Sequence, residues 1–117
     1  MEVQLAVREF ALALPGAWED HPWGESVAKV GKKVFAFMGH PDYPPGMSVK
    51  LPDSGGFALA QPYAQPTGYG LGKAGWVSIS FEGPNAPDLP LALEWVEESY
   101  RAIAPKKLVN ELDALGR

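Results

Sequence analysis

Apolar residues recur along the chain with two different spacings, and these spacings predict its secondary structure. Residues 2–14 and 88–104 carry apolar side chains at helical spacing, which predicts one amphipathic helix near each end. Residues 106–115 repeat that spacing more briefly and predict a last helix. Between them, short β-prone runs separated by Gly and Pro predict strands. The chain therefore divides into helical ends and a strand-rich middle.

Residues 22–39 predict a β-hairpin around which the middle of the chain is organised. Two β-prone runs, residues 26–30 and 33–38, are joined by Gly31-Lys32. Glycine adopts the positive φ of a tight hairpin turn without steric cost. Strict alternation divides the second run between two faces, with Val34, Ala36 and Met38 on one and Phe35 and Phe37 on the other.

The remaining middle segments predict further strands and a short helix. Residues 47–51 alternate as a half-exposed strand, a short helix follows Pro52, and residues 76–81 form the last strand. The glycine-rich residues 63–75 predict a flexible connector, because the phosphate-loop motif GxxxxGK[ST] is absent. The order of elements favours an α+β fold, a single domain over residues 1–117 whose antiparallel sheet is flanked by N- and C-terminal helices.

Residues 18–25 predict a turn-rich connector that contains His21 and three carboxylates. The only other histidine is His40, so the chain offers fewer imidazoles than zinc sites usually use. No nucleophile motif accompanies them. We therefore expect no metal site, no cofactor and no enzymatic activity. Trp18 and Trp23 are expected to pack the first helix against the hairpin.

Composition excludes several classes of protein. The chain contains no cysteine, which excludes disulfides, thiol catalysis and cysteine-ligated metal sites. No apolar run approaches the ~20 residues that span a bilayer. Charged residues interrupt the N-terminal segment, so we expect neither a signal peptide nor a membrane partner. These features favour a cytoplasmic protein, which we expect to be a monomer or a weak dimer.

Charge is distributed unevenly along the chain. The net charge of −4 argues against a general nucleic-acid binder, but residues 29–75 carry five lysines against Asp42 and Asp53. The candidate contacts to nucleic acid are these lysines and the aromatic residue that begins the last strand: Lys29, Lys32, Lys33, Lys50, Lys73 and Trp76. Tyr69 is a second aromatic candidate for stacking on a base. A nucleic-acid-binding function requires these side chains to meet on one surface.

Five segments follow one another in a recognisable order: PWGE, KVGKKVFAF, MSVKLPD, GYGLGKAGWVSISF and WVEESYRAIAPKK. This arrangement covers nearly the whole chain and resembles the MmcQ/YjbR-like family of small bacterial proteins, whose fold is similar to that of the frataxin homologue CyaY. The family pattern falls on Pro22, Trp23 and Gly24, on Lys29 through Lys33, and on Lys50, Lys73, Trp76, Ser99 and Tyr100. The chain departs from it at Gly70-Leu71-Gly72, where many members carry His or Asn.

The resemblance and the residues leave three functions open. The family's double-wing arrangement implies a DNA-binding module, for which five engaged lysines predict a salt slope of about −4 to −5. The abundant aromatic residues favour a second interpretation, the binding or sequestration of a small aromatic molecule. Iron handling, by analogy with CyaY, is a third. It requires surface carboxylates on the first helix, which offers Glu2 and Glu9.

Overall fold

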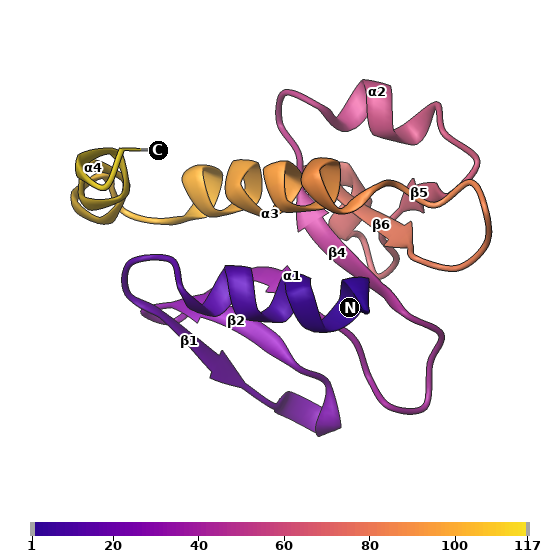
Figure 1. The fold of residues 1–117 in the computed structure, drawn as a ribbon, viewed down its shortest axis with the longest axis horizontal. Coiled ribbons are helices and arrows are strands. Elements are labelled where there is room, and N and C mark those ends of the chain that lie inside the picture. The colour runs from indigo at the N-terminus through magenta and orange to yellow at the C-terminus, as the bar shows by residue number, and fades with distance from the viewer. Residues whose placement is uncertain (1, 117) are drawn as a thin grey trace.

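A computed structural model of the chain describes residues 2–116 and confirms the predicted α+β fold (Figure 1). Its elements follow in the order α1 (Val3–Leu12), β1 (Ala17–Asp20), η1 (Pro22–Gly24), β2 (Val27–Val30), β3 (Lys33–Phe37), β4 (Gly46–Lys50), α2 (Gly55–Leu59), β5 (Ala64–Pro66), η2 (Leu71–Ala74), β6 (Trp76–Ser80), α3 (Leu89–Ile103) and α4 (Lys106–Ala114). No helix within residues 2–116 is both long and apolar enough to cross a bilayer.

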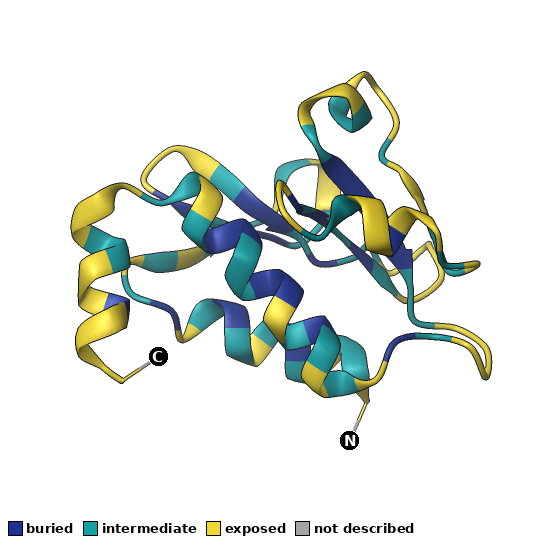
Figure 2. Cartoon of the chain, turned by 90° about the horizontal axis from the view of Figure 1, so that it is seen from above, coloured by how far each residue is buried: buried dark blue, intermediate teal, exposed yellow. Residues whose placement is uncertain are grey.

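The six strands form one antiparallel sheet in the order β1-β2-β3-β4-β6-β5. Helices α1 and α3 lie side by side across one face of this sheet (Figures 1 and 2). The buried residues concentrate where these two helices meet the strands, as Figure 2 shows. The helical stripe predicted for α1 supplies Val7 and Ala11 to this core, and α3 supplies Trp95 and Tyr100.

Both edge strands lie in segments that the sequence predicted to be connectors. Residues 17–20 form β1, which pairs with β2, and residues 64–66 form β5, which pairs with β6. β5 has three residues and ends in Pro66, which an edge strand tolerates because only one of its sides must supply N–H donors. Short edges of mixed polarity carry little apolar periodicity, so their partners determine them more than their own sequence does.

The predicted division of β3 between two faces is wrong at its centre because the strand contains a β-bulge. The register shifts between Ala28, which pairs with Ala36, and Lys29, which pairs with Val34. Phe35 is therefore an extra residue in β3, and a bulge allows two successive side chains to point the same way. Phe35 joins Ala36 and Met38 in the core, while Val34 and Phe37 lie outside the core cluster.

A buried serine of α3 connects β3 to β4 at the point where their pairing ends. The last paired residues are Ala36 and Val49. One residue beyond, the Ser99 hydroxyl accepts a hydrogen bond from the Lys50 backbone N–H at 2.8 Å and donates one to the Phe35 carbonyl. Ser99 is fully buried, so it satisfies two backbone groups that would otherwise lack partners. This contact fixes the end of β4, and with it Lys50.

Candidate nucleic-acid interface on the open face of the sheet

The face of the sheet opposite α1 and α3, called the open face here, carries no α-helix within residues 2–116. Strand alternation assigns its side chains, because cross-strand partners share a face. Val49 and Val77 are paired core residues, so the neighbouring pairs Lys50 with Trp76 and Ser48 with Ser78 lie on the open face. The open face is therefore the part of the sheet that is available to a ligand.

The structure brings the five predicted lysines to one end of the sheet, called the lysine end. Lys29, Lys32 and Lys33 lie at the β2–β3 turn. Lys50 ends β4 and pairs with the first residue of β6, while Lys73 lies in η2 within the β5–β6 connection. Because antiparallel strands alternate in direction, the turn, the end of β4 and the start of β6 share one end. Two connections that carry lysines thus flank the end of β4.

Lys29 differs from the other four lysines because it is already paired. Its ammonium lies 2.7 Å from the Asp20 carboxylate and 5.2 Å from the centre of the Trp18 ring. The hydrogen bond from Lys29 is the main reason that the pKa of Asp20 lies below its usual value. Within residues 2–116 the remaining members of the lysine end make no ion pair: Lys32, Lys33, Lys50 and Lys73. The number of lysines that can contact phosphate is therefore four.

Trp76 lies at the predicted position but cannot stack on a base, which corrects its predicted role. It is 8% exposed, and its ring packs edge-on against Phe37 with 5.3 Å between the ring centres. Phe37 lies on β3, which β4 separates from β6, so the contact reaches across the open face. The accessible aromatic side chains at this end are Tyr69, which is fully exposed beside η2, and Trp18, which is 45% exposed.

Neither Trp18 nor Trp23 packs the first helix against the hairpin as predicted. Trp18 lies in β1 opposite Lys29, and its indole N–H donates to the Gly31 carbonyl at 3.0 Å, which ties the edge strand to the turn. Trp23 is 95% exposed and has a left-handed φ of 56°. A non-glycine residue in this region is strained by roughly 1–3 kcal/mol, so the surrounding turn must hold it there.

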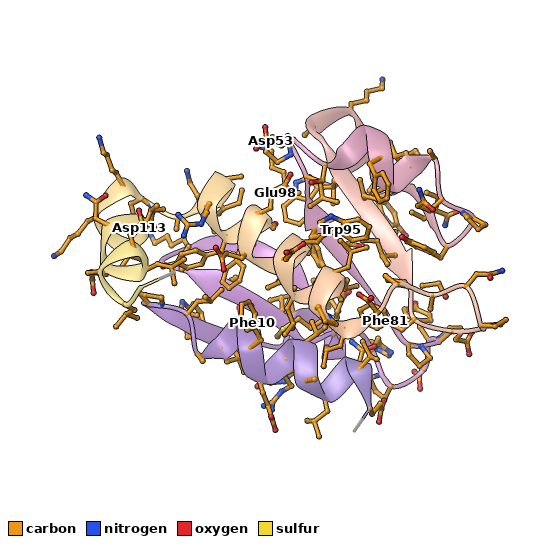
Figure 3. The ribbon with its side chains drawn as sticks, turned by 45° about the horizontal axis from the view of Figure 1, so that its top comes forward. Phe10, Asp53, Phe81, Trp95, Glu98 and Asp113 are labelled. Atoms are coloured by element: carbon orange, nitrogen blue, oxygen red, sulfur yellow. The ribbon has the colours of Figure 1, made fainter. Side chains whose placement is uncertain are left out.

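The helices α3 and α4 carry a group of acidic residues on the helical side of the sheet. In α3, Arg101 is bound by Glu97 at 3.0 Å and by Asp113 of α4 at 2.9 Å. The Glu98 carboxylate accepts hydrogen bonds from the backbone N–H groups of Asp53 and Ser54 at 2.9 Å, so α3 anchors the start of α2 (Figure 3). Arg101 is thus neutralised, as is Arg8 of α1 by Glu19, and the helical layer retains excess negative charge.

The opposite end of the open face contains a cleft of about 600 Å³. Phe37, Ser48 and Ser78 form part of its floor, and the loop of residues 39–45 forms a wall. Glu25 also lines it, and burial raises the pKa of this carboxyl although the nearby His40 opposes the shift. The open face therefore has a lysine-rich end and a hollow end that contains carboxylates.

The described chain offers no preformed metal centre. Within residues 2–116, no three His, Asp or Glu side chains gather closely enough to hold a metal ion. His21 lies 3.3 Å from Glu19, but that carboxylate is already bound by Arg8 and by the Ser26 hydroxyl. The interpretation as an iron-handling protein therefore gains no support from the geometry.

Comparison with protein families gives one match. A family model described as YjbR matches residues 12–102, a span that includes the whole sheet and most of α3. Comparison with curated proteins finds no match to the chain.

Proposed function

The chain belongs to the YjbR family, and on that basis we propose that it is a non-enzymatic DNA-binding protein of the bacterial cytoplasm. It binds duplex DNA against the lysine end of its open face and acts as a monomer or weak dimer. The β2–β3 turn and the β5–β6 connection are the two wings that the family resemblance implies. Each carries exposed lysine.

The observation that carries this proposal is the placement of four lysines without ion pairs at one end of the sheet: Lys32, Lys33, Lys50 and Lys73. Duplex DNA presents about one negative charge per 1.7 Å of axis, so lysines on two neighbouring connections can contact phosphates together. The acidic helices cover the other face of the sheet, which keeps their repulsion away from the bound duplex.

Exposed aromatic side chains also favour the lysine end as the DNA-binding surface. Tyr69 is next to a glycine on each side, at a left-handed φ of 58°, and it is fully exposed in the connection that also carries Lys73. A ring held in this way is available to pack on a sugar or an unstacked base. Trp18 supplies a second, half-exposed ring beside the turn. Phosphate contacts thus provide most of the affinity, and the rings provide contacts near the grooves.

Fluorescence anisotropy of a short labelled duplex, titrated with protein between about 50 and 200 mM salt, tests the proposal. Four engaged lysines predict a slope of log K against log salt of about −3.6, smaller in magnitude than five lysines would give. Absence of binding at the lowest salt, or an affinity that does not change with salt, would contradict the proposal.

A pair of matched double variants locates the interface. Lys32→Gln with Lys33→Gln removes two exposed charges from the turn, and we expect the slope to fall in magnitude by about 2. Lys106→Gln with Lys107→Gln removes two exposed charges from α4 and should leave the slope unchanged. If the slope falls equally in the two variants, any positive charge on the protein contributes to DNA binding. The assignment of the interface to the lysine end would then be wrong.

A further inference from the structure

The cleft at the hollow end of the open face has the size and walls of a small-molecule site. Its volume of about 600 Å³ lies within the range of roughly 300–1,000 Å³ that is typical of such sites. Aromatic and proline side chains make up much of its apolar lining: Phe37, Tyr43, Pro44, Pro45, Pro62 and Tyr63. Flat apolar walls of this kind suit a flat ring system better than a flexible aliphatic chain.

The wall formed by residues 39–45 is held in place by hydrogen bonds at both ends. From α1, the Gln4 side chain donates to the carbonyls of Met38 and Gly46, and it accepts from the Gly46 N–H at 2.7 Å. Within the loop, the His40 and Tyr43 rings lie 4.9 Å apart. A ligand entering the cleft therefore meets a wall that is already ordered, which lowers the entropic cost of binding.

A chain of hydroxyl groups includes Ser48 and Ser78 on the floor of the cleft and continues to Thr67 outside its lining. The Ser48 and Ser78 hydroxyls lie 2.8 Å apart, and the Ser78 and Thr67 hydroxyls lie 2.9 Å apart. A hydroxyl has one donor and two acceptor positions, so such a chain keeps free capacity to accept a hydrogen bond from a ligand. The floor thus offers acceptors to a ligand that carries N–H groups.

The charge of the lining determines which sign of charge a ligand should carry. Glu25 and Glu82 line the cleft, and among the described lining residues there is no lysine or arginine. His40 is the one basic side chain there, and its Nδ1 accepts a hydrogen bond from the Asp42 backbone N–H at 3.0 Å. The faces of the aromatic walls also carry negative partial charge and attract cations. Carboxylates, hydroxyl acceptors and ring faces all favour a positively charged ligand.

We propose that this cleft binds a planar aromatic cation, with its ring system against Phe37 and Tyr43 and its positive group beside Glu25. The exposed Trp23 is followed by Gly24, which lies against the lining residue His40. A side chain at Gly24 would approach the His40 Nε2 to 3.2 Å. The left-handed backbone conformation of Trp23 accompanies an indole that lies in solvent.

Titration of the full chain, freed of nucleic acid, with the cationic acridine proflavine tests this proposal through the fluorescence of the dye. Saturable binding at one site is expected. The anionic tricycle anthracene-9-carboxylate, which has a similar ring system, should bind at least about tenfold more weakly, because a hydrogen-bonded charge pair contributes roughly that factor. Equal affinity for the two compounds, or a signal that never saturates, would overturn the proposal.

Three variants assign the site. Glu25→Gln removes the carboxylate and should weaken proflavine binding about tenfold, and Tyr43→Ala should weaken it several-fold. Glu94→Gln removes one exposed carboxylate from α3 on the other side of the sheet and should have no effect. Tyr43 is 70% exposed, so Tyr43→Ala should leave the fold intact. If Glu25→Gln lowers the melting temperature, the effect of Tyr43→Ala on proflavine binding decides whether the cleft is the site. A loss with Glu94→Gln as large as with Glu25→Gln would refute the assignment.

The test is independent of DNA binding. The double variant at Lys32 and Lys33 lies at the other end of the open face, so it should retain full affinity for proflavine even where its affinity for DNA has fallen. If that variant loses proflavine binding as well, the dye binds elsewhere and the cleft is not its site.

Discussion

Replacing Ser99 with alanine tests how α3 holds the sheet together. The hydroxyl joins the Lys50 N–H to the Phe35 carbonyl, and both bonds are lost in Ser99→Ala. Phe35 is fully buried, so its carbonyl is left without a partner, at a cost of roughly 1–3 kcal/mol. The partly buried Lys50 N–H adds a smaller cost, which gives a total of about 2–4 kcal/mol.

Urea denaturation followed by circular dichroism measures this loss, which corresponds to a decrease of about 10 °C in melting temperature for a chain of this size. Ser80→Ala is the matched control, because its hydroxyl accepts one bond from the exposed Glu82 N–H, and its cost should stay below about 0.5 kcal/mol. Amide exchange at Lys50 should also accelerate in Ser99→Ala. A loss no larger than that of Ser80→Ala would refute the reasoning.

Two further predictions concern an ion pair and a close backbone contact of the sheet. The Arg8 guanidinium holds the pKa of Glu19 at about 2, below the ordinary 4.5, so this pair stabilises the fold above pH 4.5 and the contribution is lost as the pH falls toward 2. The cost of Arg8→Ala, about 1 kcal/mol or less because Arg8 is 44% exposed, should therefore shrink over that range in urea titrations, and a constant cost would argue against the pair. Gly46→Ala places a Cβ 2.6 Å from the Ile79 carbonyl oxygen and should destabilise the fold by more than about 1 kcal/mol, whereas Gly68→Ala, which meets open space, should leave thermal melts nearly unchanged.

The sequence predicted the elements whose own periodicity is strong. The apolar stripes of α1 and α3 and the alternation of β4 and β6 are long enough to specify which face is buried, and the structure follows them. The family resemblance is confirmed over residues 12–102. These features depend on the spacing of residues that are close together in the chain, and this spacing can be read from a single sequence.

Features that depend on partners far away in the chain could not be predicted. The bulge directs Phe35 toward Tyr100 of α3, whose ring meets it edge-on with 5.2 Å between the ring centres. Nothing in the sequence around either residue indicates that the two side chains are in contact. The burial of Trp76 likewise comes from Phe37 on another strand, and the pairing of Lys29 comes from Asp20 on an edge strand that was not predicted.

The cleft was missed for a related reason. Its lining comes from residues 25, 37, 39–40, 43–48, 62–65, 78–80 and 82, which only the strand order brings together. The exposure of Trp23, in contrast, had a signal in the sequence. Trp23 lies between Pro22 and Gly24, a tight turn in which a large aromatic side chain has little room to become buried. The position of Trp23 in this turn therefore indicated its exposure better than the hydrophobicity of tryptophan did.

The most direct measurement is an NMR titration of the isotopically labelled chain with a short DNA duplex at low salt. If the lysine end is the binding surface, amide shifts concentrate in residues 31–33, 49–50 and 69–76, and adding salt reverses them. Residues of α1 and α3 that face solvent then stay unchanged. Shifts confined to the helices, or no shifts at duplex concentrations well above that of the protein, would contradict the proposed DNA interface.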